Sequence, residues 1–304
     1  MTNSFKNKRF EKIRNETSRL LKELGYITTN IAYEKMVENP YLEGLYENCA
    51  RDSCNRHINR HDKLHAMTVT LNAINMFVIL KDERGLRRYI DPITGNRSFG
   101  FSTLTTLLKL YNVADSTAQD FTCTCIMLST FCHDMFRFMT RDHPVAAALL
   151  IPKFAQEILP SLLSPEMTII GYERFLPTIQ SSIYKHEGIE EALNAEEGLV
   201  MLADVIDNDE NRIKNASPID VVLEDPRPIE HFSCKSIYHP VKISKGTLKK
   251  IDLTVQLKES AGWYQVHRMV NALKNSLLYP YISLNVILPR KNNPIEIPIT
   301  VKTR

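Results

Sequence analysis

The sequence predicts an α+β protein of two domains, with an all-α domain over residues 1–215 followed by a small α+β domain over residues 216–304. Hydrophobic residues recur at spacings of three and four through most of the first part, as in helices packed on a core. Beyond residue 216 they alternate with polar residues in short runs, as in half-buried strands. The chain of 304 residues is long enough for two domains of ordinary size.

Three helices are predicted before residue 81. The first covers residues 10–24 and ends at Gly25, which suits a helix C-terminus. A short helix follows over residues 31–37 and is ended by Pro40. The third, over about 57–80, is the longest. On it, three histidines four residues apart share one face: His57, His61 and His65.

The remaining segments follow the same two periodicities. Residues 81–102 contain glycine, proline and arginine, which predicts a loop or hairpin. Helical spacing then returns in four segments: 104–111, 121–138, one that begins at His143 and Pro144, and one that ends near 186–188. The last helix of the first domain runs from Glu196 to about Arg212. The second domain is predicted to contain strands at 251–257, 282–288 and 297–301 and a helix at 263–278.

The stretch 132–137 carries the most informative pattern. His133 and Asp134 follow an apolar run, 121–131, that is typical of a buried helix. Burying an unpaired carboxylate is costly, so Asp134 requires a compensating cation, and a metal ion is the simplest one. Other His and Asp residues in apolar-periodic segments could complete such a site: His65, His186 and Asp204.

The order H…HD…D on successive helices, formed by His65, His133 with Asp134, and Asp204, resembles the HD-domain metal-dependent phosphohydrolases. Residues 203–207 are similar to that superfamily's closing ADxxD segment. Two further histidines resemble those of members with a second metal: His143 in the segment 142–144 and His186 in the segment 185–187.

A closer resemblance is to an archaeal subfamily of HD proteins with a small C-terminal α+β domain. Its DxxExR segment is matched by Asp207, Glu210 and Arg212, and its AG-aromatic-Q-V segment by residues 261–266. The resemblance covers roughly residues 60–304. It implies an all-α HD-domain helical bundle at the N-terminal side.

The resemblance also implies the roles of the site residues. The candidate metal ligands are His65, His133, Asp134, His143, His186 and Asp204. The candidate catalytic residues are Asp134, Asp207, Arg212 and Lys185. Imidazole and carboxylate ligands suit one or two divalent ions of Mn, Fe, Co, Ni or Zn. Such an ion activates water and neutralises a phosphoryl oxygen, so the expected function is hydrolysis of a phosphate ester, in particular that of a nucleotide.

Several of these residues also fit a role outside a metal site. His143 could be an exposed residue before a helix, His186 a helix C-terminal cap, and Asp207 part of a solvated acidic face. His61 could be a further ligand, a proton shuttle or an exposed helix residue. Arg137 and the arginines of residues 84–97 are further candidates for binding phosphate, although a soluble hairpin accounts for the latter better. The rival function is a nucleotide-responsive regulatory protein whose pocket binds its ligand without turnover.

Composition excludes some partners. The net charge of +3 and the dispersed basic residues do not indicate a nucleic-acid-binding surface. The expected partner, a small phosphate ester, is what the resemblance implies. No uninterrupted apolar window of about 18 residues occurs, so no membrane span is expected. The six cysteines form no CxxC pair, which favours a reducing, cytoplasmic compartment. The C-terminal domain is expected to assist either homodimer formation or substrate selection.

Overall fold

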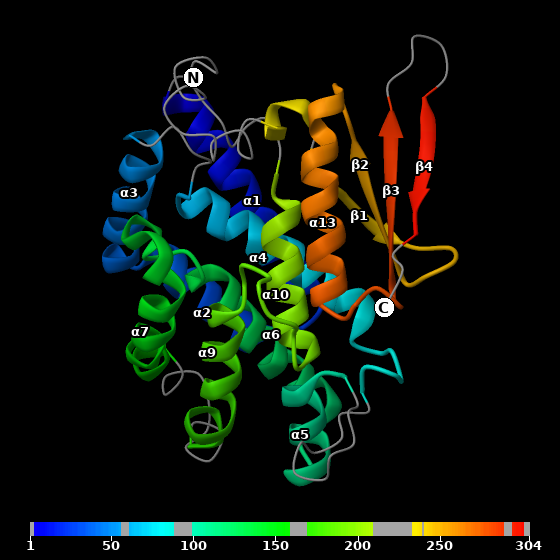
Figure 1. The fold of residues 1–304 in the computed structure, drawn as a ribbon. Coiled ribbons are helices and arrows are strands. Elements are labelled where there is room, and N and C mark those ends of the chain that lie inside the picture. The colour runs from blue at the N-terminus through cyan, green and yellow to red at the C-terminus, as the bar shows by residue number, and fades with distance from the viewer. Residues whose placement is uncertain are drawn as a thin grey trace.

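The computed structural model describes residues 3–55, 61–87, 99–158, 169–208, 233–238, 240–288 and 294–300. Within these ranges the chain contains ten α-helices and one mixed sheet of four strands near its C-terminus. The helices form the larger body and the sheet lies at one side of it (Figure 1). This arrangement confirms a helical part joined to a small α+β part. The predicted boundary near residue 215 lies outside the described residues.

Three helices form the N-terminal part: α1 (Asn3–Glu23), α2 (Ile27–Glu38) and α3 (Pro40–Asn55). Gly25 follows α1 with a φ of +72°, as a helix C-terminus favours. Helix α3 was not predicted, because Pro40 was interpreted only as the end of α2. Pro40 instead begins α3, and the Asn39 side chain accepts hydrogen bonds from the backbone N–H groups of Tyr41 and Leu42 at 2.9 and 3.1 Å.

Helix α4 (Lys63–Leu80) crosses the centre of the helical body. It begins after Asp62, whose carboxylate accepts the backbone N–H of His65 at 3.2 Å. The predicted continuous helix from about residue 57 is therefore wrong, since His61 precedes α4. His57 lies outside the described residues. His61 and His65 consequently do not share one helical face.

Helix α4 is also the one described helix that is long and apolar enough to cross a membrane. Of its apolar window, 78% is buried inside the protein. Core helices of soluble proteins meet the same two criteria, and the burial of α4 fits such a helix. A cytoplasmic location and a homodimer stay predictions.

The other helices of the body are α5 (Ser102–Leu110), α6 (Asp115–Cys132), α7 (His143–Ile158), α9 (Leu176–Tyr184) and α10 (Ala195–Ile206). Two of them end earlier than predicted. Helix α6 stops at Cys132 rather than near Phe138, and α10 stops at Ile206 rather than near Arg212. Each helix ends within two residues of a candidate ligand, His133 for α6 and Asp204 for α10. Glu210 and Arg212 lie outside the described residues.

The sheet has the strand order β1-β2-β3-β4. Its strands are β1 (Lys242–Lys245), β2 (Ile251–Gln256), β3 (Ile282–Leu288) and β4 (Ile295–Ile299). Strands β2 and β3 are parallel and are connected through α13 (Trp263–Asn275), whereas the two outer pairs are antiparallel. The predicted strands are confirmed, and β1 is an additional one. Short helical turns occur at η2 (Arg137–Asp142), η4 (Gly171–Phe175), η6 (Ser233–Ser236) and η7 (Ser260–Gly262).

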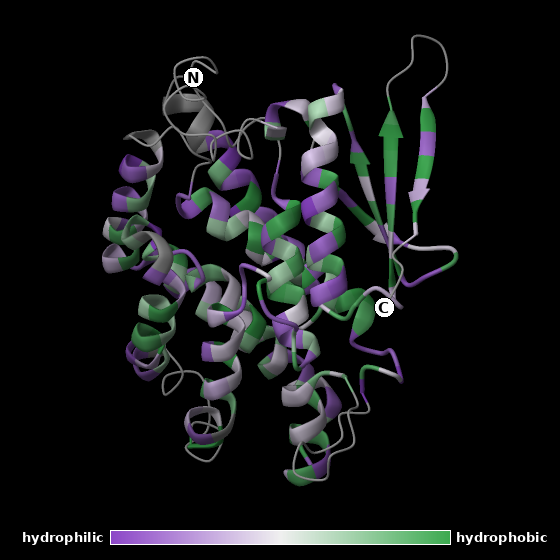
Figure 2. Cartoon of the chain, in the orientation of Figure 1, coloured by the Kyte–Doolittle hydropathy of each residue, from purple (hydrophilic) through white to green (hydrophobic). Residues whose placement is uncertain are grey.

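Helix α13 lies between the sheet and α10 (Figure 1). Hydrophobic residues are prominent in α10 and in β2 and β3, on either side of it (Figure 2). A Cβ atom at Gly198 of α10 would lie 2.4 Å from the carbonyl oxygen of Ser276, so glycine permits this close contact. The Asn275 side chain also donates to the carbonyl of Gly188 at 2.6 Å. The C-terminal part is thus fixed against the segment that follows α9.

Candidate metal centre

The structure brings all six predicted metal ligands together. One group consists of His65, His133, Asp134 and Asp204, and a second consists of Asp134, His143 and His186. Within each group the ligand atoms lie within 4.8 Å of one another. All of these side chains are buried except Asp204, which is half-buried. Buried His and Asp groups that could hold a metal ion are therefore present, as predicted.

Asp134 is shared by the two groups. Its Oδ2 lies 3.5 Å from His65 Nε2 and 3.4 Å from His133 Nε2. Its Oδ1 lies 3.1 Å from His143 Nε2 and 3.4 Å from His186 Nε2. The two carboxylate oxygens of one residue thus face two different pairs of histidines.

Asp204 completes the first group from α10. Its Oδ1 lies 3.2 Å from His65 Nε2 and 3.5 Å from His133 Nε2. The Nε2 atom of His133 is buried and makes no hydrogen bond of acceptable geometry within the described residues. An imidazole nitrogen at this position, beside two carboxylates, suits a cation better than it suits packing.

Backbone carbonyls orient two of the rings. His133 Nδ1 donates to the carbonyl of Thr130 at 2.7 Å, and His186 Nδ1 donates to the carbonyl of Ile183 at 2.7 Å. A proton on Nδ1 leaves Nε2 as the nitrogen with a lone pair for a metal. The predicted alternative of a helix cap for His186 is compatible with ligation, because one ring nitrogen serves each purpose.

Asp207 lies behind His65. Its Oδ2 is 2.6 Å from His65 Nδ1, and its side chain is buried. A solvated acidic face is therefore excluded for this residue. A carboxylate bonded to the far nitrogen of a ligand histidine fixes the ring and increases its basicity. The geometry is the one expected of a residue that positions a ligand ring.

The charges in the cluster depend on one another. Burial lowers the pKa of His133, but Asp134 and Asp204 outweigh it and raise this pKa to about 10. Burial by itself would raise the pKa of Asp134, yet the neighbouring His133 and His61 hold it well below its usual range. Burial by itself would also raise the pKa of Asp204, but the neighbouring His133 and His65 hold it well below its usual range. The carboxylates thus require a positive charge, which a divalent ion would supply in place of the proton on His133.

His61 reaches the cluster from the segment before α4. Its ring is buried, with Nε2 3.7 Å from Asp134 Oδ2 and Nδ1 3.3 Å from the hydroxyl of Ser53. The interpretation of His61 as an exposed helix residue is therefore wrong. Its position leaves the two site roles, ligand or proton shuttle, open.

A pocket of about 420 Å³ opens onto the cluster. Its lining includes Asp134, His186 and Asp204 together with three residues of α13, namely Arg268, Asn271 and Ala272. The sequence did not single out Arg268 or Asn271. The match at residues 261–266 marks the start of this helix, but only tertiary packing reveals which of its faces meets the pocket.

The predicted phosphate-binding residues differ in position. Arg137 lines the pocket, with its Nη1 2.9 Å from Glu187 Oε1 and 3.1 Å from His143 Nδ1. Lys185 instead forms an ion pair with Glu197 at 3.3 Å and is not among the described residues of the pocket lining. The structure does not bring Lys185 into the cluster. Arg212 lies outside the described residues.

Cys132 precedes the site but does not join it. Burial raises the pKa of its thiol, so the group stays protonated, as predicted for a residue within an apolar run. Cys123 and Cys125 are likewise buried in α6 with free thiols. The cysteines of α6 are small core residues.

Comparisons of the chain with protein-family models, with curated proteins and with solved structures found no match. The described residues establish a helical bundle with a buried His and Asp cluster that is compatible with a metal site. Membership of the HD superfamily, and of its archaeal subfamily, stays a prediction from the sequence motifs.

Proposed function

We propose that the protein is a metal-dependent phosphohydrolase that cleaves a phosphate ester of a nucleotide. The observation that most supports this proposal is the position of Asp134, whose oxygens face separate histidine pairs. A shared carboxylate is suited to two ions about 3.5–4 Å apart, an arrangement used in phosphoryl hydrolysis. Imidazole and carboxylate donors favour Mn, Fe, Co, Ni or Zn.

A divalent ion at this site lowers the pKa of a water molecule and neutralises charge on a phosphoryl oxygen. The protein supplies the remaining functions. Asp134 and Asp204 hold negative charge where the ions bind, and backbone contacts direct the Nε2 atoms of His133 and His186 inward. Arg137, held by Glu187, presents its guanidinium beside the histidines and can donate to a phosphate oxygen.

The size and charge of the pocket support a small anionic substrate. A volume of about 420 Å³ falls within the range of small-molecule sites. The lining contains three carboxylates, Asp134, Glu187 and Asp204, and two guanidiniums, Arg137 and Arg268. With one divalent ion bound, the summed charge of these groups becomes positive, which favours an anionic ligand over a neutral one.

The test combines elemental analysis of the purified protein with a hydrolysis screen of mono-, di-, tri- and cyclic nucleotides. We expect a bound transition metal and turnover of at least one nucleotide. Asp134→Ala should lose both while circular dichroism shows an intact helical fold. Asp82→Ala is the control, because Asp82 is exposed and pairs with Arg87 far from the cluster.

Two results would contradict parts of the proposal. Full metal occupancy in Asp134→Ala would exclude Asp134 as a ligand. A metal-loaded protein that binds a nucleotide tightly but leaves every tested ester intact would favour the regulatory function over the hydrolase.

A further inference from the structure

One wall of the pocket belongs to the C-terminal part of the chain. Asn271 and Ala272 follow Arg268 by three and four residues on α13, so both lie on the same side of that helix as Arg268. This face meets the same pocket as Asp134 and Asp204, which come from the helical body. The two parts of the chain therefore build one binding site.

The position of this wall is fixed by contacts along α13. Near the start of the helix, Gln265 is buried and its amide donates to Ser233 Oγ at 2.7 Å. At its end, Asn275 donates to the carbonyl of Gly188, two residues after His186. Val266 and Met269 are buried in the core between these points. Arg268 is thus held at a defined place relative to the cluster.

The two guanidiniums of the pocket have different partners. Arg137 is bound to Glu187 and lies against the ring of His143, so it is adjacent to the metal ligands. Arg268 makes one long hydrogen bond, 3.4 Å from its Nη1 to Gln265 Oε1, and has no carboxylate within 4.0 Å among the described residues. A half-buried guanidinium with five N–H donors and one weak acceptor retains donors for an anion.

We propose that Arg268 forms a second anion subsite of this pocket, which binds the phosphate next to the one held at the metal cluster. The substrate class is then a nucleoside diphosphate or triphosphate rather than a monophosphate. Asn271, one turn further along the same face, offers its amide to the remainder of the ligand. This inference rests on the proposed function for the identity of the first subsite.

Affinity measurements on the metal-loaded protein test the subsite without requiring turnover. The probes are inorganic phosphate, with one phosphoryl group, and methylenebisphosphonate, with two adjacent ones that cannot be hydrolysed. Calorimetric titration should show that wild-type protein binds the bisphosphonate at least about tenfold more tightly than phosphate, since a guanidinium adds charge-assisted hydrogen bonds. Elemental analysis after each titration verifies that the ion is retained.

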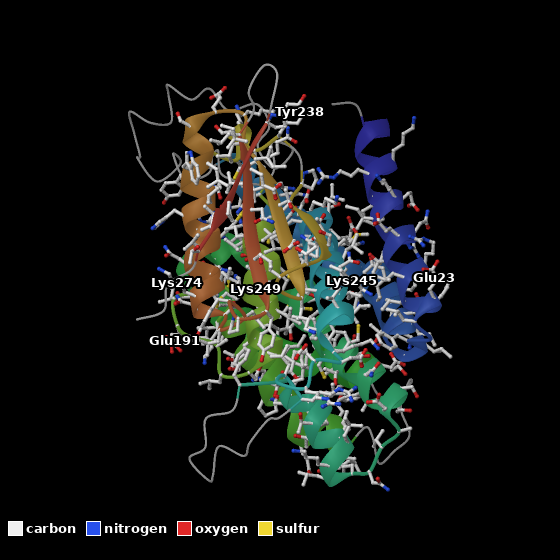
Figure 3. All side chains as sticks on the ribbon, turned by 90° about the vertical axis from the view of Figure 1, so that its right-hand side faces the viewer. Glu23, Glu191, Tyr238, Lys245, Lys249 and Lys274 are labelled. Carbon is white, nitrogen blue, oxygen red and sulfur yellow. The ribbon has the colours of Figure 1, made fainter. Side chains whose placement is uncertain are left out.

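Arg268→Ala should abolish this gain while changing the affinity for phosphate by less than about twofold. Arg268→Lys should restore part of the gain, because the charge remains and the planar fork is lost. Lys274→Ala is the matched control, since Lys274 is an exposed cation on the same helix (Figure 3). It is not among the described residues that line the pocket. This variant should bind both probes as the wild type does.

Three results would overturn the subsite. The first is that the wild type binds both probes with equal affinity. The second is that Arg268→Ala loses affinity for both probes by the same factor, and the third is that it loses affinity for neither. Failure of the proposed function is a separate outcome, because it shows as a lack of hydrolysis of every nucleotide by metal-loaded protein. The affinity difference between the two probes can still be measured in that case.

Discussion

Asp207→Asn tests how the site orients its ligands. The substitution keeps the shape of the side chain but removes the negative charge that lies 2.6 Å from His65 Nδ1. The ring then loses a charged acceptor, so its Nε2 becomes less basic and less firmly directed toward Asp134 and Asp204. Partners of this kind contribute about 10- to 100-fold in metal affinity, which equals about 1.4–2.7 kcal/mol.

Competition with a chromophoric chelator would measure this change in affinity. Asp82→Asn is the matched control, because its side chain is 68% exposed and pairs with Arg87 instead of a histidine. We expect a shift of at least tenfold for Asp207→Asn and none for the control. A variant that binds metal within about twofold of the wild type, with its helical content unchanged, would refute the argument that this carboxylate positions His65.

Four further predictions concern pH and stability. Metal affinity should rise by about tenfold per pH unit from pH 6 to 9 in buffered titrations, because the ion displaces a proton from His133, whose folded pKa is about 10. In metal-free protein this proton stabilises the fold below the ordinary pKa of 6.5, and the contribution is lost as pH rises toward 10, as pH-dependent urea unfolding can show. Gly198→Ala should lower the free energy of unfolding by about 1–3 kcal/mol, because the added Cβ would lie 2.4 Å from the carbonyl oxygen of Ser276. An unchanged urea midpoint of unfolding would disprove this close contact. Lys185→Met should lower the free energy of unfolding by roughly 3–5 kcal/mol, because it leaves Glu197 buried without its cation. Weaker substrate binding with no loss of stability would instead favour a role for Lys185 at the phosphate.

The ligand cluster was predictable because its signals are local. His133 and Asp134 stand at the end of an apolar helix, where a bare carboxylate is difficult to explain by packing. His65 and Asp204 each interrupt an apolar face. Their meeting in space follows from packing these faces into one core, so the sequence pattern carried the information.

Other parts of the site depend on details that periodicity does not resolve. Asp62 caps α4, so the helix begins after His61. The helical face that His61 was expected to share with His65 therefore does not form. Arg268 reaches the pocket through the packing of α13 on α10, which no local pattern near residue 268 indicates.

The elements of the fold also differ in how clearly the local sequence predicts them. Strands β2 and β3 alternate clearly and were predicted, whereas β1 has one hydrophobic residue, Ile243, among its four and gives no alternation. Helix α3 was missed because proline both ends and begins helices. The side chain of Asn39, which caps α3, distinguishes the two cases.

Three helices end at the metal cluster. Helix α6 ends directly before His133, α9 ends two residues before His186, and α10 ends two residues after Asp204. The C-terminal end of a helix carries a partial negative charge from its unpaired carbonyls. These three ends therefore add negative potential to the cluster, while the N-termini of α4 and α7, which begin at Lys63 and His143, offset part of it. A variant that lacks one ligand keeps these helix ends, but their partial charges are too small to hold an ion through purification.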